Sequence, residues 1–96
     1  MFIRIAGIEL KPPLLRGFIE PDGGLHVWCE ALEGVHDESG AKKLLDMESC
    51  TQSVKWENKD GVEHQRIMQL LAANTHSRKS PDGKKITHYN FTLVEV

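Results

Sequence analysis

The fold is decided between residues 58 and 74, where the chain reads NKDGVEHQRIMQLLAAN. One interpretation is a helix, because Asp60 followed by Glu63 has the spacing of a capping box. The other is a strand that returns from a tight turn at Asp60-Gly61. The helix would bury Ile67, Leu70 and Leu71, whereas the strand would place on one face Val62, His64, Arg66, Met68 and Leu70. The turn chemistry leads us to predict the strand.

Two further Asp-Gly pairs, at positions 22–23 and 82–83, also indicate tight turns. Glycine readily adopts the positive φ of a tight turn, so Asp-Gly between strand-like runs predicts a β-hairpin. Together with the pair at 60–61, these turns predict an antiparallel meander.

Alternating apolar residues predict strands on either side of these turns. In the run that starts at Leu25, Val27 and Cys29 share an apolar face while Trp28 points the opposite way. Further strands are predicted as a first run over residues 2–10 that stops at Pro12-Pro13, a short run around Val54 and Trp56, and a closing run over residues 89–96.

One helix is predicted from Ser39, a candidate N-cap, to Ser49, since Ala41, Leu44 and Leu45 recur at helical spacing. The expected core contains Ile3 or Ile8, Val27, Leu44, Leu45, Val54, Leu70, Phe91 and Leu93. The predicted fold class is therefore α+β and mainly antiparallel β, arranged as a small partial β-barrel with one flanking α-helix.

Composition predicts one globular domain over residues 1–96, with 40% apolar and 27% charged residues and no linker-like stretch. The formal net charge of −2 gives no overall field that would draw the chain onto nucleic acid. The chain begins without a signal-like apolar run and contains no run of about 18 apolar residues. We therefore expect a cytoplasmic protein without membrane insertion, in which Cys29 and Cys50 are reduced thiols.

No sequence motif indicates an enzyme. There is no glycine-rich phosphate loop and no nucleophile elbow, so we expect neither catalysis nor a cofactor. His26 and Cys29 are three residues apart, but a strand places them on opposite faces, so no metal site is predicted. The acidic residues between Glu30 and Glu38 are expected to form a solvated loop before the helix.

A basic segment over residues 74–85 is the most informative charged feature. Arg78, Lys79, Lys84 and Lys85 against Asp82 give 4 − 1 = +3. We expect these four cations to be exposed on a mobile loop, where they contact a negatively charged partner surface. Trp28 is the other predicted partner-binding residue, because an aromatic side chain on the outer face of a strand is a common interface anchor.

The order of these elements resembles the second half of the tail-tube family, which contains phage tail-tube proteins and the haemolysin-coregulated (Hcp) ring protein of type VI secretion. The matching pieces are the helix with Leu44 and Leu45, the short strand with Val54 and Trp56, the turn and return over residues 59–67, and the closing strand over residues 89–96. Residues 1–5 also resemble the opening strand of the ring protein. The resemblance implies a small β-barrel with a flanking helix that works by self-association.

The predicted function is a non-enzymatic protein-interaction or assembly protein, acting through self-association or docking on a larger protein. A small virally encoded inhibitor of a host protein machine is a variant of this interpretation. The alternative is a single-strand nucleic-acid binder with an oligonucleotide-binding (OB) barrel. In that case the four cations would hold phosphates while Trp56, Tyr89 or Phe91 stacked on bases.

Overall fold

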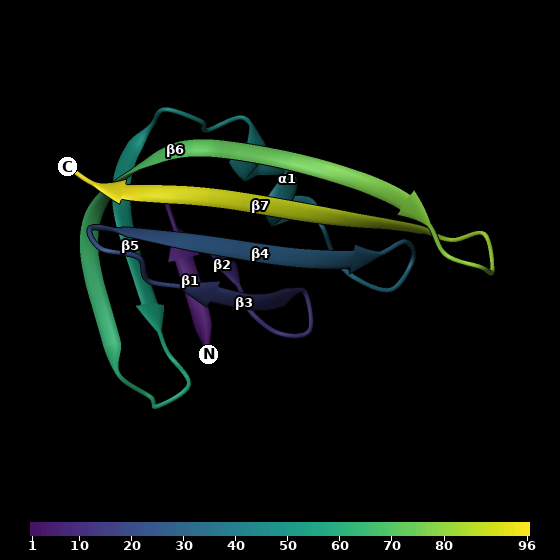
Figure 1. Cartoon of the computed structure of the whole chain (residues 1–96), viewed down its shortest axis with the longest axis horizontal. Coiled ribbons are helices and arrows are strands. Elements are labelled where there is room, and N and C mark those ends of the chain that lie inside the picture. The colour runs from purple at the N-terminus through teal and green to yellow at the C-terminus, as the bar shows by residue number, and fades with distance from the viewer.

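The computed structural model describes residues 1–96 as seven β-strands and one α-helix (Figure 1). In chain order the elements are β1 (Phe2–Ile5), β2 (Ile8–Leu10), β3 (Leu15–Ile19), β4 (Gly24–Leu32), α1 (Ser39–Leu45), β5 (Thr51–Glu57), β6 (Glu63–Lys79) and β7 (Lys85–Glu95). The mainly antiparallel β prediction with one helix is confirmed. The helix is seven residues long, and no helix of this chain has the length and apolar character needed to cross a membrane.

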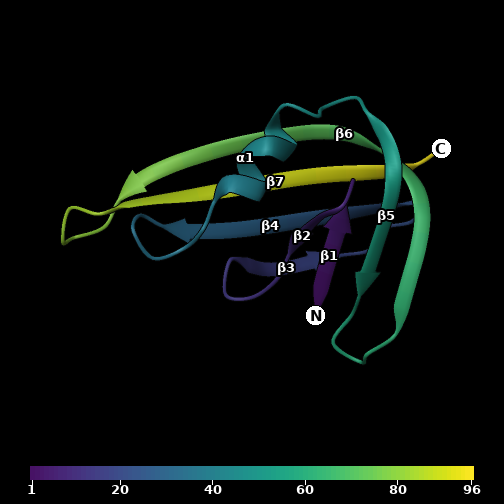
Figure 2. The same cartoon turned by 180° about the vertical axis from the view of Figure 1, so that it is seen from behind.

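All seven strands belong to one antiparallel sheet in the order β2-β1-β5-β6-β7-β4-β3. β6 is the longest strand, and it pairs with β5 over Glu63–Gln69 and with β7 from Met68 to Lys79. A β-bulge between Leu70 and Ala72 lies where these two pairings meet, and bulges bend a strand. As a result, β1 and β5 run at a steep angle to β4 and β7 (Figure 2). The sheet is open, with β2 and β3 at its edges, and does not close into a barrel.

The three predicted Asp-Gly turns are confirmed as hairpin connections. Gly23, Gly61 and Gly83 have φ angles of 71°, 78° and 86°, which glycine adopts without steric cost. They join β3 to β4, β5 to β6, and β6 to β7. The predicted single strand over residues 2–10 is wrong, because Ala6 and Gly7 turn the chain with φ angles of 52° and 78°. The result is a further hairpin, in which Ile5 pairs with Ile8.

The helix ends earlier than the sequence predicts, at Leu45 instead of Ser49. Its N-cap position is Glu38, and Ser39 is already the first helical residue, with its N–H bonded to Asp37 Oδ1 at 3.0 Å. Turns follow the helix, and Ser49 adopts a φ of 75° while its N–H donates to the carbonyl oxygen of Leu70 at 2.7 Å. This hydrogen bond fixes the chain against β6 just before β5 begins at Thr51.

The core lies on the inner face of the curved sheet, under α1, as one cluster of 17 buried residues. The prediction for the core is confirmed, with Leu45 only partly buried; its buried members are Ile3, Val27, Leu44, Val54, Leu70, Phe91 and Leu93. The two halves of the sheet are also joined by a polar contact, because Trp56 Nε1 of β5 donates to a carboxylate oxygen of Glu20, which follows β3. Trp56 is buried, so this acceptor satisfies an indole N–H that water does not reach freely.

Candidate protein-interaction surface

The predicted basic segment forms the end of the long β6–β7 hairpin. A tight turn over Ser80-Pro81-Asp82-Gly83 closes it, with Ser80 N–H bonded to Lys84 O at 2.8 Å and Gly83 N–H bonded to Ser80 O at 2.9 Å. The Asp82 carboxylate accepts from the Ser80 hydroxyl and from the Lys84 N–H. These bonds favour the ionised form and hold the pKa of Asp82 below its usual range. The Asp82 carboxylate therefore stabilises the turn.

The four predicted cations are all exposed at this end of the molecule. The prediction of a mobile loop is wrong for most of the segment: Arg78 pairs with Ile86 and Lys79 with Lys85 in the β6–β7 ladder, and only residues 80–84 lie outside the strands. The polar sequence from Asn74 to Lys79 forms a strand because β7 offers it a continuous partner. No carboxylate lies within ion-pair distance of any of the four cations, so they present charge that is free to meet a partner.

The acidic stretch before the helix is a mostly exposed loop, as the sequence predicts, and two of its carboxylates also contact β7. Glu33 accepts the N–H of Lys85 at 3.1 Å, and Glu38 accepts the hydroxyl of Tyr89 at 2.6 Å. Burial and this bond to Glu38 raise the pKa of Tyr89. Glu33 and Glu38 therefore fasten this loop to the half of β7 that lies nearer the hairpin tip.

Trp28 lies on the outer face of β4, as predicted, and is half-buried. Its ring covers Gly17 of β3 so closely that a Cβ atom there would lie 2.8 Å from a ring carbon. The ring also meets His26 edge to face, with centroids 5.8 Å apart. Trp28 pairs with Asn90, five residues along β7 from Lys85, which places it about 17 Å from the cations. The structure therefore separates Trp28 from the hairpin end.

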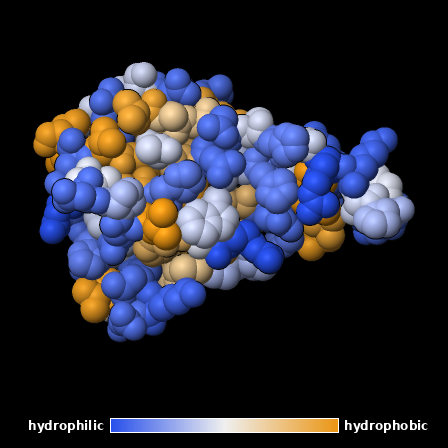
Figure 3. Space-filling view, viewed as in Figure 1, coloured by the Kyte–Doolittle hydropathy of each residue, from blue (hydrophilic) through white to orange (hydrophobic).

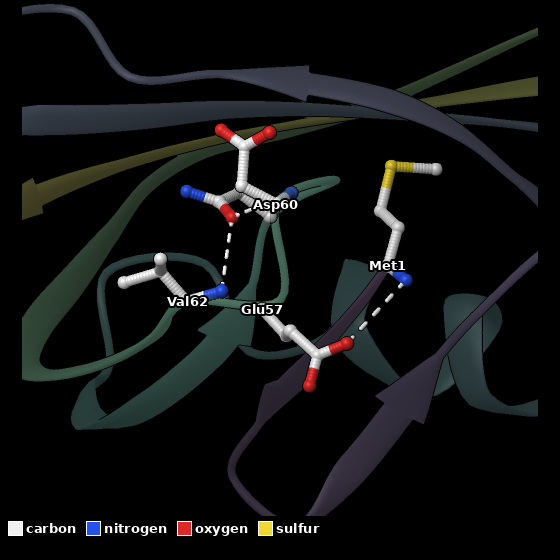
Figure 4. Close-up of polar contacts among 5 residues, drawn as sticks. Met1, Glu57, Asp60 and Val62 are labelled. Atoms are coloured by element: carbon white, nitrogen blue, oxygen red, sulfur yellow. Dashed lines mark hydrogen bonds and ion pairs between the residues drawn. The ribbon is translucent and has the colours of Figure 1, made fainter.

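Trp28 instead lines a shallow groove of about 450 Å³ between the β3 edge and the β5–β6 turn. Residues of both signs surround it, including Arg16, Glu20, Lys59 and Asp60, together with the apolar side chain of Ile19. Figure 4 shows polar contacts beside this groove, where the Met1 amine points to the Glu57 carboxylate, 3.8 Å away. The adjoining turn is fixed by Asn58 Oδ1, which accepts the N–H groups of Asp60 and Val62.

The aromatic side chains that a nucleic-acid interface would need are not on the surface. Trp56, Tyr89 and Phe91 are 5%, 2% and 0% exposed and belong to the core. They point into the concave side of the sheet and cannot stack on bases. This removes the residues on which the nucleic-acid interpretation depends, although the cations themselves are exposed.

The potential ligand residues also lie apart. Cys29 is buried on the inner face of β4 while His26 lies on the outer face, as predicted, and no three His, Cys, Asp or Glu side chains converge as metal ligands would. Burial raises the pKa of the Cys29 thiol to about 12, which keeps it protonated and unreactive at neutral pH. Cys50 is exposed.

An apolar patch near the C-terminal end is a surface feature that the sequence analysis missed. Ile67, Leu71 and Val96 are 55%, 51% and 72% exposed, and Val96 N–H approaches Ile67 O at 3.5 Å. Figure 3 shows hydrophobic atoms gathered at this end, whereas the tip of the hairpin is mostly hydrophilic. The signal was present in the sequence, because Ile67 is one residue from the buried Met68 and Val96 is three residues from the buried Leu93, and odd offsets along a strand place side chains on the opposite face.

Comparisons with family models, with curated proteins and with solved structures give no match for this chain.

Proposed function

We propose that this chain is a non-enzymatic protein-interaction or assembly protein, which uses the basic end of its β6–β7 hairpin to contact a negatively charged protein surface. That surface belongs to a larger partner protein or to another copy of the chain. The tail-tube resemblance implies self-association, and a phage or secretion-tube assembly is the setting in which we propose it.

One observation carries the proposal: four exposed cations without carboxylate partners are concentrated at one end of the molecule. Residues 74–85 carry +3 while the whole chain carries −2, so the remaining residues carry −2 − 3 = −5. The positive charge of the hairpin end favours contact with an acidic surface and disfavours contact between two hairpin ends. The residues outside 74–85 in a second copy of the chain carry net negative charge, so a second copy can also supply an acidic surface.

The test replaces Arg78, Lys79, Lys84 and Lys85 together by glutamine. The matched control replaces four other exposed cations that lie away from the Trp28 groove, Lys11, Lys42, Lys43 and Arg66, by glutamine. Both variants change the net charge equally, so a difference between them reports the position of the charge. Sedimentation over a concentration series measures self-association, and quantitative capture from extract measures retention of specific partners.

We expect the wild type and the control variant to self-associate or to retain the same partner, and the hairpin variant to lose this binding. Binding of the wild type should weaken as salt concentration rises. A wild-type chain that remains monomeric and retains no partner would contradict the proposal, and so would a hairpin variant that binds normally. Tight binding of a short oligonucleotide in a polarisation titration would favour the nucleic-acid alternative instead.

A further inference from the structure

The outer half of β6 has a neighbouring strand on one side only. β6 contains 17 residues, but β5 pairs with Glu63–Gln69 alone. From Asn74 to Lys79 the strand pairs with β7, every residue is exposed, and no element lies along its other side. Figures 1 and 2 show this open edge running from α1 to the hairpin tip. Such an edge presents unpaired main-chain groups to any strand that can approach it.

The hydrogen-bond pattern identifies which groups face outward. In an antiparallel pair, alternate residues direct their N–H and C=O groups toward the partner strand or away from it. Ser80 N–H bonds across the hairpin to Lys84, while Ala73 N–H bonds outward to Glu48 Oε2 at 3.2 Å. The outward set therefore continues from Ala73 through Thr75 and Ser77. The main-chain groups of Thr75 and Ser77 have no partner on that side.

The groups along this edge of β6 favour an acidic partner strand. The one outward N–H group that has a partner, that of Ala73, is bonded to a carboxylate. Beyond Ser77 the edge is flanked by the four unpaired cations, and residues 74–79 contain no acidic side chain. Two copies of this edge paired together would bring no carboxylate to these cations. An added strand with acidic side chains at alternate positions would place carboxylates on one face of the sheet, opposite the cation on that face.

We propose that an extended, acidic segment of a partner protein binds to the Asn74–Lys79 edge as an added β-strand. This inference rests on the proposed function and specifies its mode: main-chain hydrogen bonds to Thr75 and Ser77 give binding, and Arg78, Lys79 and the lysines of β7 select acidic side chains. Lysine and arginine on an edge strand also discourage pairing with neutral strands. The same cations thus disfavour pairing with a neutral strand and favour pairing with an acidic one.

The test uses a capped peptide in which valine alternates with glutamate, titrated by fluorescence polarisation against the full chain. Thr75→Pro removes an N–H that faces away from β7, so it blocks strand addition without removing a bond of the β6–β7 ladder. Thr75→Ala is the matched control, because it removes the side chain and keeps the N–H. A peptide with lysine in place of glutamate tests charge selection, and an N-methylated glutamate peptide tests main-chain pairing if Thr75→Pro does not fold.

We expect the glutamate peptide to bind the wild type and Thr75→Ala alike, and to bind Thr75→Pro about tenfold more weakly. The N-methylated peptide should weaken to a similar degree, and the lysine peptide should not bind. Equal binding to Thr75→Pro and loss in the four-glutamine hairpin variant would overturn strand addition while leaving the proposed function intact. Unchanged binding to both variants would overturn both. Absence of binding, equal binding of the lysine peptide, or displacement by an oligonucleotide at lower concentration would overturn the acidic-strand inference.

Discussion

The buried thiol of Cys29 makes the stability of this fold depend on pH in the alkaline range. Cys29 is 1% exposed, and burial raises its pKa from 9.0 to about 12. The folded chain therefore keeps the thiol proton at a pH where the unfolded chain releases it. Folding stability is fully present below pH 9.0 and falls as the pH rises toward 12, because the unfolded state then binds fewer protons.

The magnitude follows from this difference between the folded and unfolded pKa values. Each pH unit above 9.0 lowers the free energy of unfolding by about 1.4 kcal/mol, so at a pH of about 10.5 the loss is about 2 kcal/mol. Tyr89 acts in the same direction, because burial and its bond to Glu38 raise its pKa as well. A comparison of the wild type with Cys29→Ala reports chiefly the thiol, since the other titratable groups are present in both chains and Cys29 is only the smallest cause of the raised Tyr89 pKa.

Urea unfolding near pH 8 and near pH 10.5, under reducing conditions, measures this effect. Cys29→Ala lowers stability at both pH values because it leaves a small cavity, but the cavity does not titrate. The wild type should lose about 2 kcal/mol more than Cys29→Ala between the two pH values. An equal loss in both chains would refute the reasoning, because it would mean that Cys29 ionises as readily in the folded state as in the unfolded state.

Three further predictions concern packing. Gly17→Ala should destabilise the chain by about 1 kcal/mol and shift its tryptophan fluorescence, because the new Cβ displaces the Trp28 ring that lies 2.8 Å away; unchanged fluorescence would contradict this contact. A double-mutant cycle of Glu20→Ala and Trp56→Phe, followed by urea unfolding, should give a coupling free energy of about 1 kcal/mol, whereas zero coupling would mean that the hydrogen bond between the sheet halves contributes nothing. Leu93→Ala, at 0% exposure, should cost about 2–5 kcal/mol in calorimetry, and a loss under about 1 kcal/mol would argue against its place in the core.

The sequence predicted the hairpins well because their turn chemistry is local. Asp-Gly places glycine where a positive φ is needed, and all three pairs occur at hairpin turns in the structure. The same logic correctly favoured the strand after Gly61 over the helix. The hairpin at Ala6-Gly7 was missed because Ala6 carries no turn signal and adopts its φ of 52° only within the β1–β2 pair. β3 was not predicted, since it is only five residues long, contains Gly17 and has a register shift between Leu15 and Gly17.

The sequence predicted which cations are exposed at the candidate site, but it did not predict that three of the four lie in β-strands. Exposure of the cations followed from their solvation, because charged side chains stay hydrated unless they are paired. Their location on a strand did not follow, because Asn74 to Lys79 lacks the apolar alternation that predicts one. That segment is a strand because β7 pairs with it, and the apolar alternation belongs to β7, where Thr87, Tyr89 and Phe91 are buried. Such a tertiary effect leaves no local signal.

The open edge is a consequence of unequal strand lengths and of where the chain leaves α1. β4 covers β7 almost completely, from the Gly24–Val94 pair to the Leu32–Ile86 pair, so that side of the hairpin has no free edge. On the opposite side, the chain that follows α1 reaches the sheet at Leu70, where Ser49 and Cys50 bond to it, and β5 then runs away from the hairpin tip. The fold therefore covers one side of the hairpin and leaves the other side open. Because the cations are concentrated at that end, the position of the open edge and the charge that selects its partner arise from the same hairpin.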